Sequence, residues 1–506
     1  MNTNFFDFIL DNQFKNQKAI YDFLHSYEQQ TFSLKEIASE QNLSAETTAL
    51  NRVIKLINDI NHFLPPINQT VMLSDDNKFV TIDFTKHANA YLLRRHYLET
   101  SLNHKLLSDL FDESISTRQA WATEHFTSVD NMKLIINDLR THFAHFGIII
   151  NRNHQIVGNE LQIRNWACRY IKMFFSDVAA EPSQTTKLRA HLTKLVTQYL
   201  EAHENLSPFD WSTMSKVVYT FDKRLQDKHI LHQADLGAWY VKPTELSPYF
   251  QTILANLQNH LQNMYLLDDE AAYCEALYLV LIFQIEFSHD QGFWQHHPQN
   301  DQLNVLVETT TTTLNKYFNG AITPSQATTI RDLMGSPFMQ HLMSDDLISD
   351  VKPELLNDAF LNHPIMANIS KEILFATAQK LGSNKHTIIL NLFQPLLTTL
   401  LTSLDDLAFP QVNVLVEYPT LPQLKAHIIH EIQGFPWVSE TFVDSIASAD
   451  ITISDSLLLA DTPHASFIYE GLPTDAQLNL LKTHLHRLAL EKFNQRNHTA
   501  FTQKFK

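Results

Sequence analysis

The chain has 506 residues, enough for about three or four domains of roughly 150 residues, and its 44% hydrophobic and 18% charged residues are typical of folded proteins. The net charge of −17 is concentrated after residue 175, because residues 1–175 carry 17 Lys and Arg against 19 Asp and Glu, so the N-terminal third can still present a basic face to a polyanion. The nine glycines lie at least eleven positions apart, which excludes dinucleotide-binding loops, Walker A loops and nucleophile elbows.

The N-terminal sequence carries acids before its first lysine and has no small-residue cleavage site, so we expect no signal peptide. The longest nearly apolar run, residues 276–287, is too short to span a bilayer and predicts a buried helix. The two cysteines, Cys168 and Cys274, favour a reducing cytoplasm and argue against a disulfide framework or a cysteine-based zinc site. Because no HExxH motif occurs among the 26 histidines, we expect no metal and no cofactor.

A helix-turn-helix pattern starts near residue 32. Ser33 and Glu36 form a capping box that begins a short helix, and Asn42-Leu43 make the turn. Ser44 is expected to cap a longer helix, whose inner face is predicted from spacings of three and four residues to hold Thr47, Leu50, Val53, Ile54, Ile57 and Ile60. In this arrangement the second helix projects its polar N-terminal residues into a major groove of DNA.

A hairpin follows this first pattern. Strands are predicted at residues 70–73 and 79–82 on either side of a turn at residues 74–77. Lys78 lies near the tip, so the hairpin is a candidate wing that touches DNA beside the helix.

The same layout returns about 84 residues later. A short helix is predicted at residues 118–125, Phe126 is expected to plug the turn, and Ser128 caps a helix at residues 129–145. The inner face of this helix is expected to hold Met132, Ile135, Ile136 and Leu139. A second hairpin is predicted at residues 147–157. One such pattern also fits a plain helical subdomain, but two copies, each followed by a hairpin, favour a pair of winged helix-turn-helix units.

The residue pattern changes twice in the rest of the chain. Residues 180–405 are almost wholly helical and predict two consecutive helical bundles, with loops ahead of prolines such as Pro208, Pro324 and Pro353. From residue 410, two β-branched runs at residues 412–416 and 449–455 alternate with helical stretches, which predicts a small α/β domain.

Residues 157–164, read as Val-Gly-Asn-Glu-Leu-Gln-Ile-Arg, resemble the junction l-x-G-x-E-x-x-I-R at which a second winged helix runs into a helical regulatory domain. With the two preceding units, the chain resembles the Mga-type transcription regulators. This resemblance implies a mainly α multidomain protein with a winged helix-turn-helix unit at residues 1–85 and another at 86–175. It further implies phosphotransferase-regulation-like bundles at 176–292 and 293–405, and an enzyme IIB-like α/β domain at 408–506.

The sequence departs from the family pattern at two places. Enzyme IIB proteins carry a phosphoryl-accepting cysteine after their first strand, whereas here Glu417-Tyr418 follow the strand and no cysteine occurs after Cys274. In the first regulatory bundle, Arg224 of the motif H-x-x-F-x-x-x-R is present but Val217 replaces the acceptor histidine. His229 and His289 remain as candidate phosphorylation sites.

We therefore predict a non-catalytic, cytoplasmic DNA-binding transcription regulator that forms a homodimer or higher oligomer. The resemblance implies an activator that responds to sugar or phosphotransferase status and could meet phosphocarrier proteins. The residues expected to contact phosphates are Lys55, Lys78, Lys133, Arg140 and Arg152. Those expected to contact base edges are Thr48, Asn51, Arg52, Asn131 and Asn137. The alternatives are an RNA antiterminator, a sugar-phosphotransfer component and an interaction scaffold that does not touch DNA.

Overall fold

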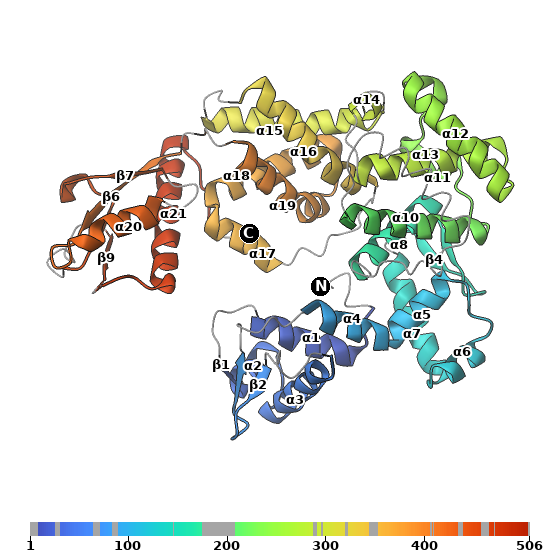
Figure 1. Ribbon diagram of the computed structural model, residues 1–506, viewed down its shortest axis with the longest axis horizontal. Coiled ribbons are helices and arrows are strands. Elements are labelled where there is room, and N and C mark those ends of the chain that lie inside the picture. The colour runs from blue at the N-terminus through green and yellow to red at the C-terminus, as the bar shows by residue number, and fades with distance from the viewer. Residues whose placement is uncertain are drawn as a thin grey trace. The chain divides into compact units, whose positions relative to one another are not determined.

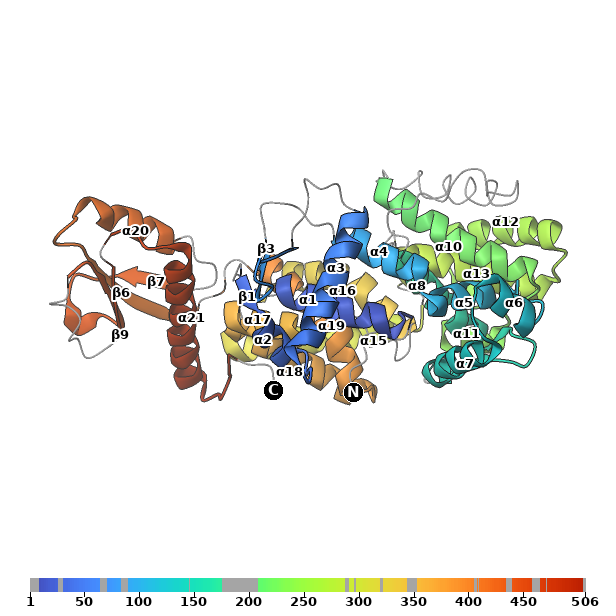
Figure 2. The same cartoon turned by 90° about the horizontal axis from the view of Figure 1, so that it is seen from below.

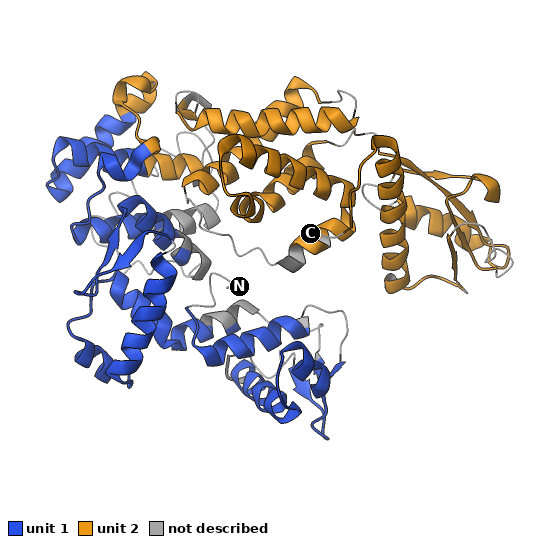
Figure 3. Ribbon diagram, turned by 180° about the vertical axis from the view of Figure 1, so that it is seen from behind, with its two compact units in different colours: residues 1–237, 253–278 blue, residues 238–252, 279–506 orange. Residues whose placement is uncertain are grey.

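The computed structural model shows a mainly α-helical chain with three small sheets among the residues that it describes, which confirms the predicted fold class (Figure 1). It describes residues 9–25, 31–63, 71–82, 90–144, 146–174, 208–286, 291–294, 297–318, 322–343, 353–404, 407, 409–433, 439–456, 465–469 and 471–503. The chain divides into two compact units, one of Met1–Gly237 with Ile253–Tyr278 and the other of Ala238–Thr252 with Leu279–Lys506 (Figure 3). The boundaries of the five predicted domains stay a prediction. No helix within the described residues is long and apolar enough to cross a membrane.

The first winged helix-turn-helix unit combines three helices with a three-stranded antiparallel sheet. Its elements are α1 (Asn12–His25), β1 (Thr31–Ser33), α2 (Leu34–Glu40), α3 (Glu46–Phe63), β2 (Val71–Leu73) and β3 (Phe79–Ile82). The strand order is β1-β3-β2, with Phe32 opposite Val80, and both of these side chains are buried. The predicted hairpin is confirmed, and its role as a wing that touches DNA stays a prediction. Strand β1 was not predicted, because three residues are too short to show a strand pattern.

The second unit repeats this plan without the third strand. Its elements are α4 (Ala90–Thr100), α5 (Leu102–Phe111), α6 (Arg118–Glu124), α7 (Val129–Ala144), β4 (Ile148–Ile150) and β5 (Ile156–Gly158), followed by α8 (Glu160–Phe174). The predicted helices and hairpin are confirmed to within a residue or two. Ser101 ties this unit to the first, because its hydroxyl donates to the carbonyl oxygen of Ile9 at 2.8 Å and to the carboxylate of Asp11 at 2.9 Å.

The middle of the chain is helical, as predicted. Its helices are α10 (Pro208–Gln226), α11 (Gln233–Leu236), η3 (Gly237–Trp239), η4 (Pro243–Glu245), α12 (Pro248–Tyr265), α13 (Asp269–Glu286), α14 (Gln291–Trp294), α15 (Asn300–Phe318), α16 (Pro324–Met343), α17 (Pro353–Asn362), α18 (Pro364–Leu381) and α19 (Lys385–Ser403). Several begin at a proline, whose fixed φ and missing N–H suit the first helical position. The expected buried helix at residues 276–287 is α13, whose residues 271–285 are all buried.

The C-terminal part is an α/β sheet with two helices (Figure 2). Its elements are β6 (Gln411–Glu417), α20 (Gln423–Gln433), β7 (Ser439–Phe442), η5 (Ile446–Ser448), β8 (Ile451–Ser454), β9 (Ala465–Ile468) and α21 (Asp475–Asn497). The four strands are parallel in the order β7-β6-β8-β9, and all four residues of β8 are buried. The two predicted strands are confirmed as β6 and β8, whereas β7 and β9 had not been predicted.

The residues after α21 fold back onto helices α15 and α18 of the same compact unit. His498 adopts a left-handed conformation that reverses the chain. The ring of Phe501 then lies 5.5 Å from that of Tyr317 and 5.8 Å from that of Phe493, and the amide nitrogen Nδ2 of Asn368 donates to the carbonyl oxygen of Thr502 at 2.7 Å. This tail therefore fastens the last helix to α15 and α18.

Candidate nucleic-acid interface

The first helix-turn-helix corner is built as its sequence predicts. The backbone N–H of Ser33 donates to the carboxylate of Glu36 at 2.7 Å, and the N–H of Glu36 donates back to the Ser33 hydroxyl at 3.2 Å, which completes the capping box. Asn42 takes a left-handed φ of 51°, and the N–H of Leu43 donates to the carbonyl of Ala38 at 2.8 Å. These contacts turn the chain from α2 into α3.

The inner face of α3 differs from the predicted one. The buried residues are Ala49, Val53, Leu56 and Ile60. Of the six residues predicted to face inward, only Val53 and Ile60 are buried, while Leu50 and Ile57 are half-buried and Thr47 and Ile54 are exposed. The prediction was wrong because apolar residues occur on two adjacent faces of this helix, and packing against α1 and α2 selects the face with the small Ala49.

The expected cap of α3 is also corrected. The amides of Thr48 and Ala49 donate to the carbonyl of Ala45, so the helix begins after Ala45 and Ser44 lies one residue too early to be its cap.

The candidate DNA-contacting residues of the first unit lie on the solvent side of α3 and at the hairpin. Asn51 and Lys55 are exposed, and Thr48 and Arg52 are half-buried. No acid occurs between Glu46 and Asp59 along this helix. The Lys78 side chain is 74% exposed and its ammonium lies 3.8 Å from the carboxylate of Asp76. Helix α3 therefore presents a basic and amide-rich face to solvent.

Phe126 does not plug the second turn. Its backbone is left-handed with φ of 52°, and its side chain is 99% exposed. The turn is closed instead by the N–H of Thr127, which donates to the carbonyl of Ala122 at 2.9 Å, and by the buried Trp121, whose indole N–H donates to Asp109 at 2.7 Å. A left-handed residue at this point directs its side chain away from the packed corner, which is why the predicted plug was wrong.

The helix α7 matches its prediction closely. The hydroxyl of Ser128 accepts from the N–H of Asn131 at 3.0 Å, which confirms the cap. Its buried residues are Met132, Ile135, Ile136, Leu139 and Phe143, of which the first four had been predicted. The buried positions 49, 53, 56 and 60 of α3 recur at 132, 136, 139 and 143, a constant offset of 83 residues. The two helices therefore turn equivalent positions outward.

The candidate residues of α7 are partly engaged within the protein. Asn131 donates through its side-chain amide to the hydroxyl of Thr127 at 2.9 Å, and the Lys133 ammonium lies 2.9 Å from the carboxylate of Asp130. Asn137 is exposed.

Arg140 and Arg152 differ in their surroundings. The Arg140 guanidinium donates to the backbone carbonyls of Ile150 and Asn151 at 3.1 and 3.3 Å, and so fastens the hairpin to the helix. Arg152 is exposed in the hairpin turn. The roles of all these residues in DNA contact stay a prediction.

Residues 88–170 match the sequence profile of the Mga helix-turn-helix domain. This part of the chain belongs to the Mga helix-turn-helix family. The matched segment contains α4 to β5 and most of α8, so the resemblance to Mga-type regulators is confirmed there. No protein in the curated set matches the chain. The matched domain is of the helix-turn-helix type, which supports a DNA-binding regulator.

The Mga domain is joined to the following helices by a buried cluster of four charges. Glu160 and Arg164 belong to α8, Arg224 to α10 and Glu275 to α13, and all four side chains are at most 7% exposed. Arg164 contacts Glu160 and Glu275 at 2.9 Å each, and Arg224 contacts Glu160 at 2.7 Å. Burial alone would raise the pKa of Glu160, but the hydrogen bond from Arg224 and the charge of Arg164 hold it below its usual range.

This cluster explains the junction motif in physical terms. Glu160 and Arg164 are the charged residues of that motif, and Arg224 is the arginine kept in the motif of the first bundle. The partner Glu275 was missed by sequence reasoning, because 111 residues separate it from Arg164 and no local spacing connects them.

His229, a predicted phosphoacceptor, lies beside this cluster. Its backbone carbonyl accepts from Arg164 at 2.9 Å, and its ring nitrogen Nε2 contacts the carboxylate of Glu113. Glu113 also accepts from the side chain of Gln155 at 2.9 Å, in the hairpin of the Mga domain. His229 therefore connects the helical region, through Glu113, to the turn end of this hairpin. Its phosphorylation stays a prediction, and His289 lies outside the described residues.

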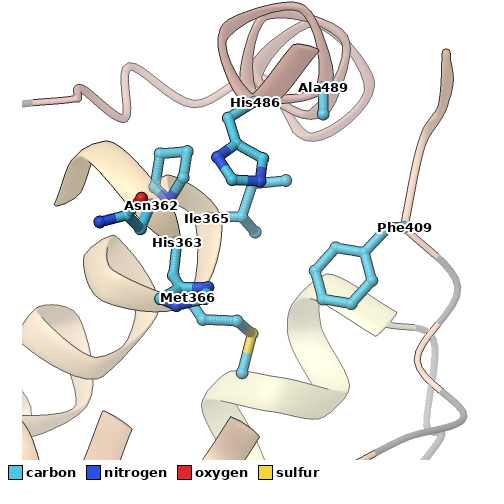
Figure 4. Close-up of a pocket in the computed structure, with 8 residues that line it drawn as sticks. Asn362, His363, Ile365, Met366, Phe409, His486 and Ala489 are labelled. Atoms are coloured by element: carbon cyan, nitrogen blue, oxygen red, sulfur yellow. The ribbon is translucent and has the colours of Figure 1, made fainter. Parts of the chain in front are cut away.

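A small hollow lies between α17, α18 and α21, in the compact unit that holds residues 279–506. It has a volume of about 10 Å³ and is lined mostly by apolar atoms (Figure 4). Its lining residues are Asn362, His363, Pro364, Ile365, Met366, Phe409, His486 and Ala489. This volume has room for no more than about one water molecule. Burial lowers the pKa of His363 to about 4, so its ring is neutral at pH 7. We assign no ligand to this hollow.

Proposed function

We propose that the protein is a non-catalytic, cytoplasmic transcription regulator that reads duplex DNA with α3 and α7. The observation that carries this proposal is the Mga helix-turn-helix match at residues 88–170, whose corner geometry is repeated in residues 31–82. Two equivalent outer faces support a pair of cooperating readers, since each helix alone offers few cations. The structure offers no observation that favours RNA over duplex DNA.

We further propose activation in response to sugar or phosphotransferase status, with phosphocarrier proteins as possible partners of the helical bundles. This proposal rests on the resemblance of the middle and C-terminal parts to the regulatory and enzyme IIB-like domains of the family. It is also supported by the buried cluster that links the Mga domain to α10 and α13. Through these contacts a conformational change in the helices can reach the DNA-binding domain.

For the C-terminal domain we propose self-association into a homodimer or higher oligomer in place of phosphoryl transfer. The loop after β6 has Tyr418 where a cysteine nucleophile is needed, and the backbone amides of Thr420 and Leu421 donate to the carboxylate of Asp455 at 3.3 and 2.7 Å. The amides that would face a phosphoryl group are thus occupied by the protein's own anion. Two-fold pairing needs only one self-complementary patch and raises DNA avidity by bringing two readers together.

The test of the α3 reader compares two variants in gel shifts with duplex DNA. Arg52→Ala is expected to lower specific affinity by about 1–3 kcal/mol, because a base contact is lost. Lys55→Ala is expected to weaken binding to all sequences alike and to reduce the salt slope by about one, because a phosphate contact is lost. Lys242→Ala, at an exposed lysine outside the reader, is the control. Wild-type binding by both α3 variants would contradict the placement of this helix in the groove.

The two readers carry opposite charges at one equivalent position, and this gives a second prediction. Lys55 of α3 corresponds to Asp138 of α7, and both are exposed. Asp138→Lys is expected to raise duplex affinity and to steepen the salt slope by about 0.9, because repulsion from a phosphate becomes attraction. The measurement is a gel shift at 50 and 200 mM salt. Asp301→Lys, at an exposed acid of α15, is the control, and an equal gain in both variants would mean that α7 does not approach the DNA.

A further inference from the structure

The outer faces of α3 and α7 each expose a branched aliphatic side chain. Leu134 of α7 is 64% exposed and Ile54 of α3 is 39% exposed. Neither belongs to the buried face that holds its helix in place, which is formed by residues 49, 53, 56 and 60 in α3 and by their counterparts in α7. These two side chains therefore lie where a groove-reading helix meets its ligand.

Each aliphatic residue has an exposed asparagine three positions away. In α3 the pair is Asn51 and Ile54, and in α7 it is Leu134 and Asn137. Residues three apart in a helix are neighbours on its surface, so each pair forms one small patch with an amide beside an apolar group. With the offset of 83 residues, Leu134 takes the position of Asn51 and Asn137 takes the position of Ile54. The two patches thus carry the same chemistry in opposite order.

This chemistry matches one base pair in the major groove. Adenine offers N7 and the N6 amino group, which an asparagine amide binds with two hydrogen bonds, and thymine offers a C5-methyl group, which an apolar side chain contacts. A G·C pair offers no methyl group. Building on the proposed function, we propose that Leu134 and Ile54 read thymine methyl groups beside adenines read by Asn137 and Asn51. Because the order is opposite in the two helices, the two A·T-containing half-sites are not copies of one another.

The experiment starts from a duplex selected by the full-length protein out of a random pool. Each thymine of that duplex is then replaced by uracil, which removes only the C5-methyl group. We expect about a fourfold loss of affinity at one thymine for each reader, the effect of one methyl group transferred out of water. Leu134→Ala should bind the thymine duplex about as weakly as the wild type binds the uracil duplex, and should no longer distinguish thymine from uracil at that position. Ile54→Ala should behave likewise at a different thymine.

Leu333→Ala is the matched control, since Leu333 is a 48% exposed leucine on α16. It is expected to keep the full uracil penalty at both positions. Equal wild-type affinity for the thymine and uracil duplexes, or a uracil penalty that survives in Leu134→Ala, would overturn the inference while leaving the proposed function in place. A protein that selects no duplex at all would overturn the proposed function and this inference with it. Circular dichroism of Leu134→Ala should match the wild type, because the residue is outside the buried face.

Discussion

Glu275→Ala is expected to destabilise the compact unit that contains the Mga domain by about 3–5 kcal/mol. The change leaves the buried guanidinium groups of Arg164 and Arg224 with only the carboxylate of Glu160, and so one positive charge is uncompensated. The backbone N–H of Leu231 would lose its acceptor as well, since it donates to the carboxylate of Glu275 at 2.8 Å. Calorimetric melting of the full chain and hydrogen exchange of α8 measure the effect. DNA binding should weaken in parallel, because α8 completes the Mga domain.

Two further variants make this result specific. Glu417→Ala removes an exposed ion pair with Lys425 and should cost less than about 1 kcal/mol. The double variant Arg164→Met with Glu275→Leu should be less destabilised than Glu275→Ala alone, since no charge is left unpaired at that point and Glu160 keeps its contact with Arg224. If Glu275→Ala were as mild as Glu417→Ala, the buried cluster would not hold the Mga domain to the following helices.

Gly158→Ala is expected to open the hairpin of the Mga domain at a cost of about 3 kcal/mol. Gly158 has φ of +146°, a region that residues with a Cβ rarely enter, and an added Cβ would lie 2.6 Å from the carbonyl oxygen of Gly147. Because the neighbour is backbone, no side chain can move to relieve the contact. Hydrogen exchange at Ile148 and Ile150 of β4 should accelerate, since β4 pairs only with β5 in this small sheet.

The matched control is Gly147→Ala. Gly147 has φ of +65°, but an added Cβ meets nothing within 4 Å, so the variant carries only a left-handed backbone cost of about 1–2 kcal/mol. A result in which both glycine variants unfold the hairpin equally would show that the close approach to Gly147 is not what requires a glycine at position 158.

The corners and helices that carry local signals could be predicted from sequence. Ser33 with Glu36 and Ser128 with Asn131 form caps within three residues, and such short-range contacts leave a readable pattern. The inner face of α7 was predicted well because, from Met132 to Phe143, all of its apolar residues except Leu134 occupy one face. In α3, by contrast, Leu50, Ile54 and Ile57 form a second apolar face that only packing can resolve.

Other features depend on partners far away in the sequence. The strands β7 and β9 lie at the edges of the C-terminal sheet with all residues only half-buried, so they lack the apolar run that revealed β8. The outward direction of Phe126 follows from one backbone angle, and the contact of His229 with Glu113 spans 116 residues. No spacing rule connects residues at such separations.

The C-terminal tail that carries Phe501 limits which segments can be swapped between this protein and a related one. The ring of Phe501 and the backbone of Thr502 contact residues of α15 and α18, which lie more than 100 positions earlier in the chain. A chimaera that takes only the residues after about 408 from this protein would therefore lack Tyr317 and Asn368, the residues that anchor the tail. Recombination that preserves this interface must transfer α15 and α18 together with the sheet, so these segments are expected to be inherited as one block.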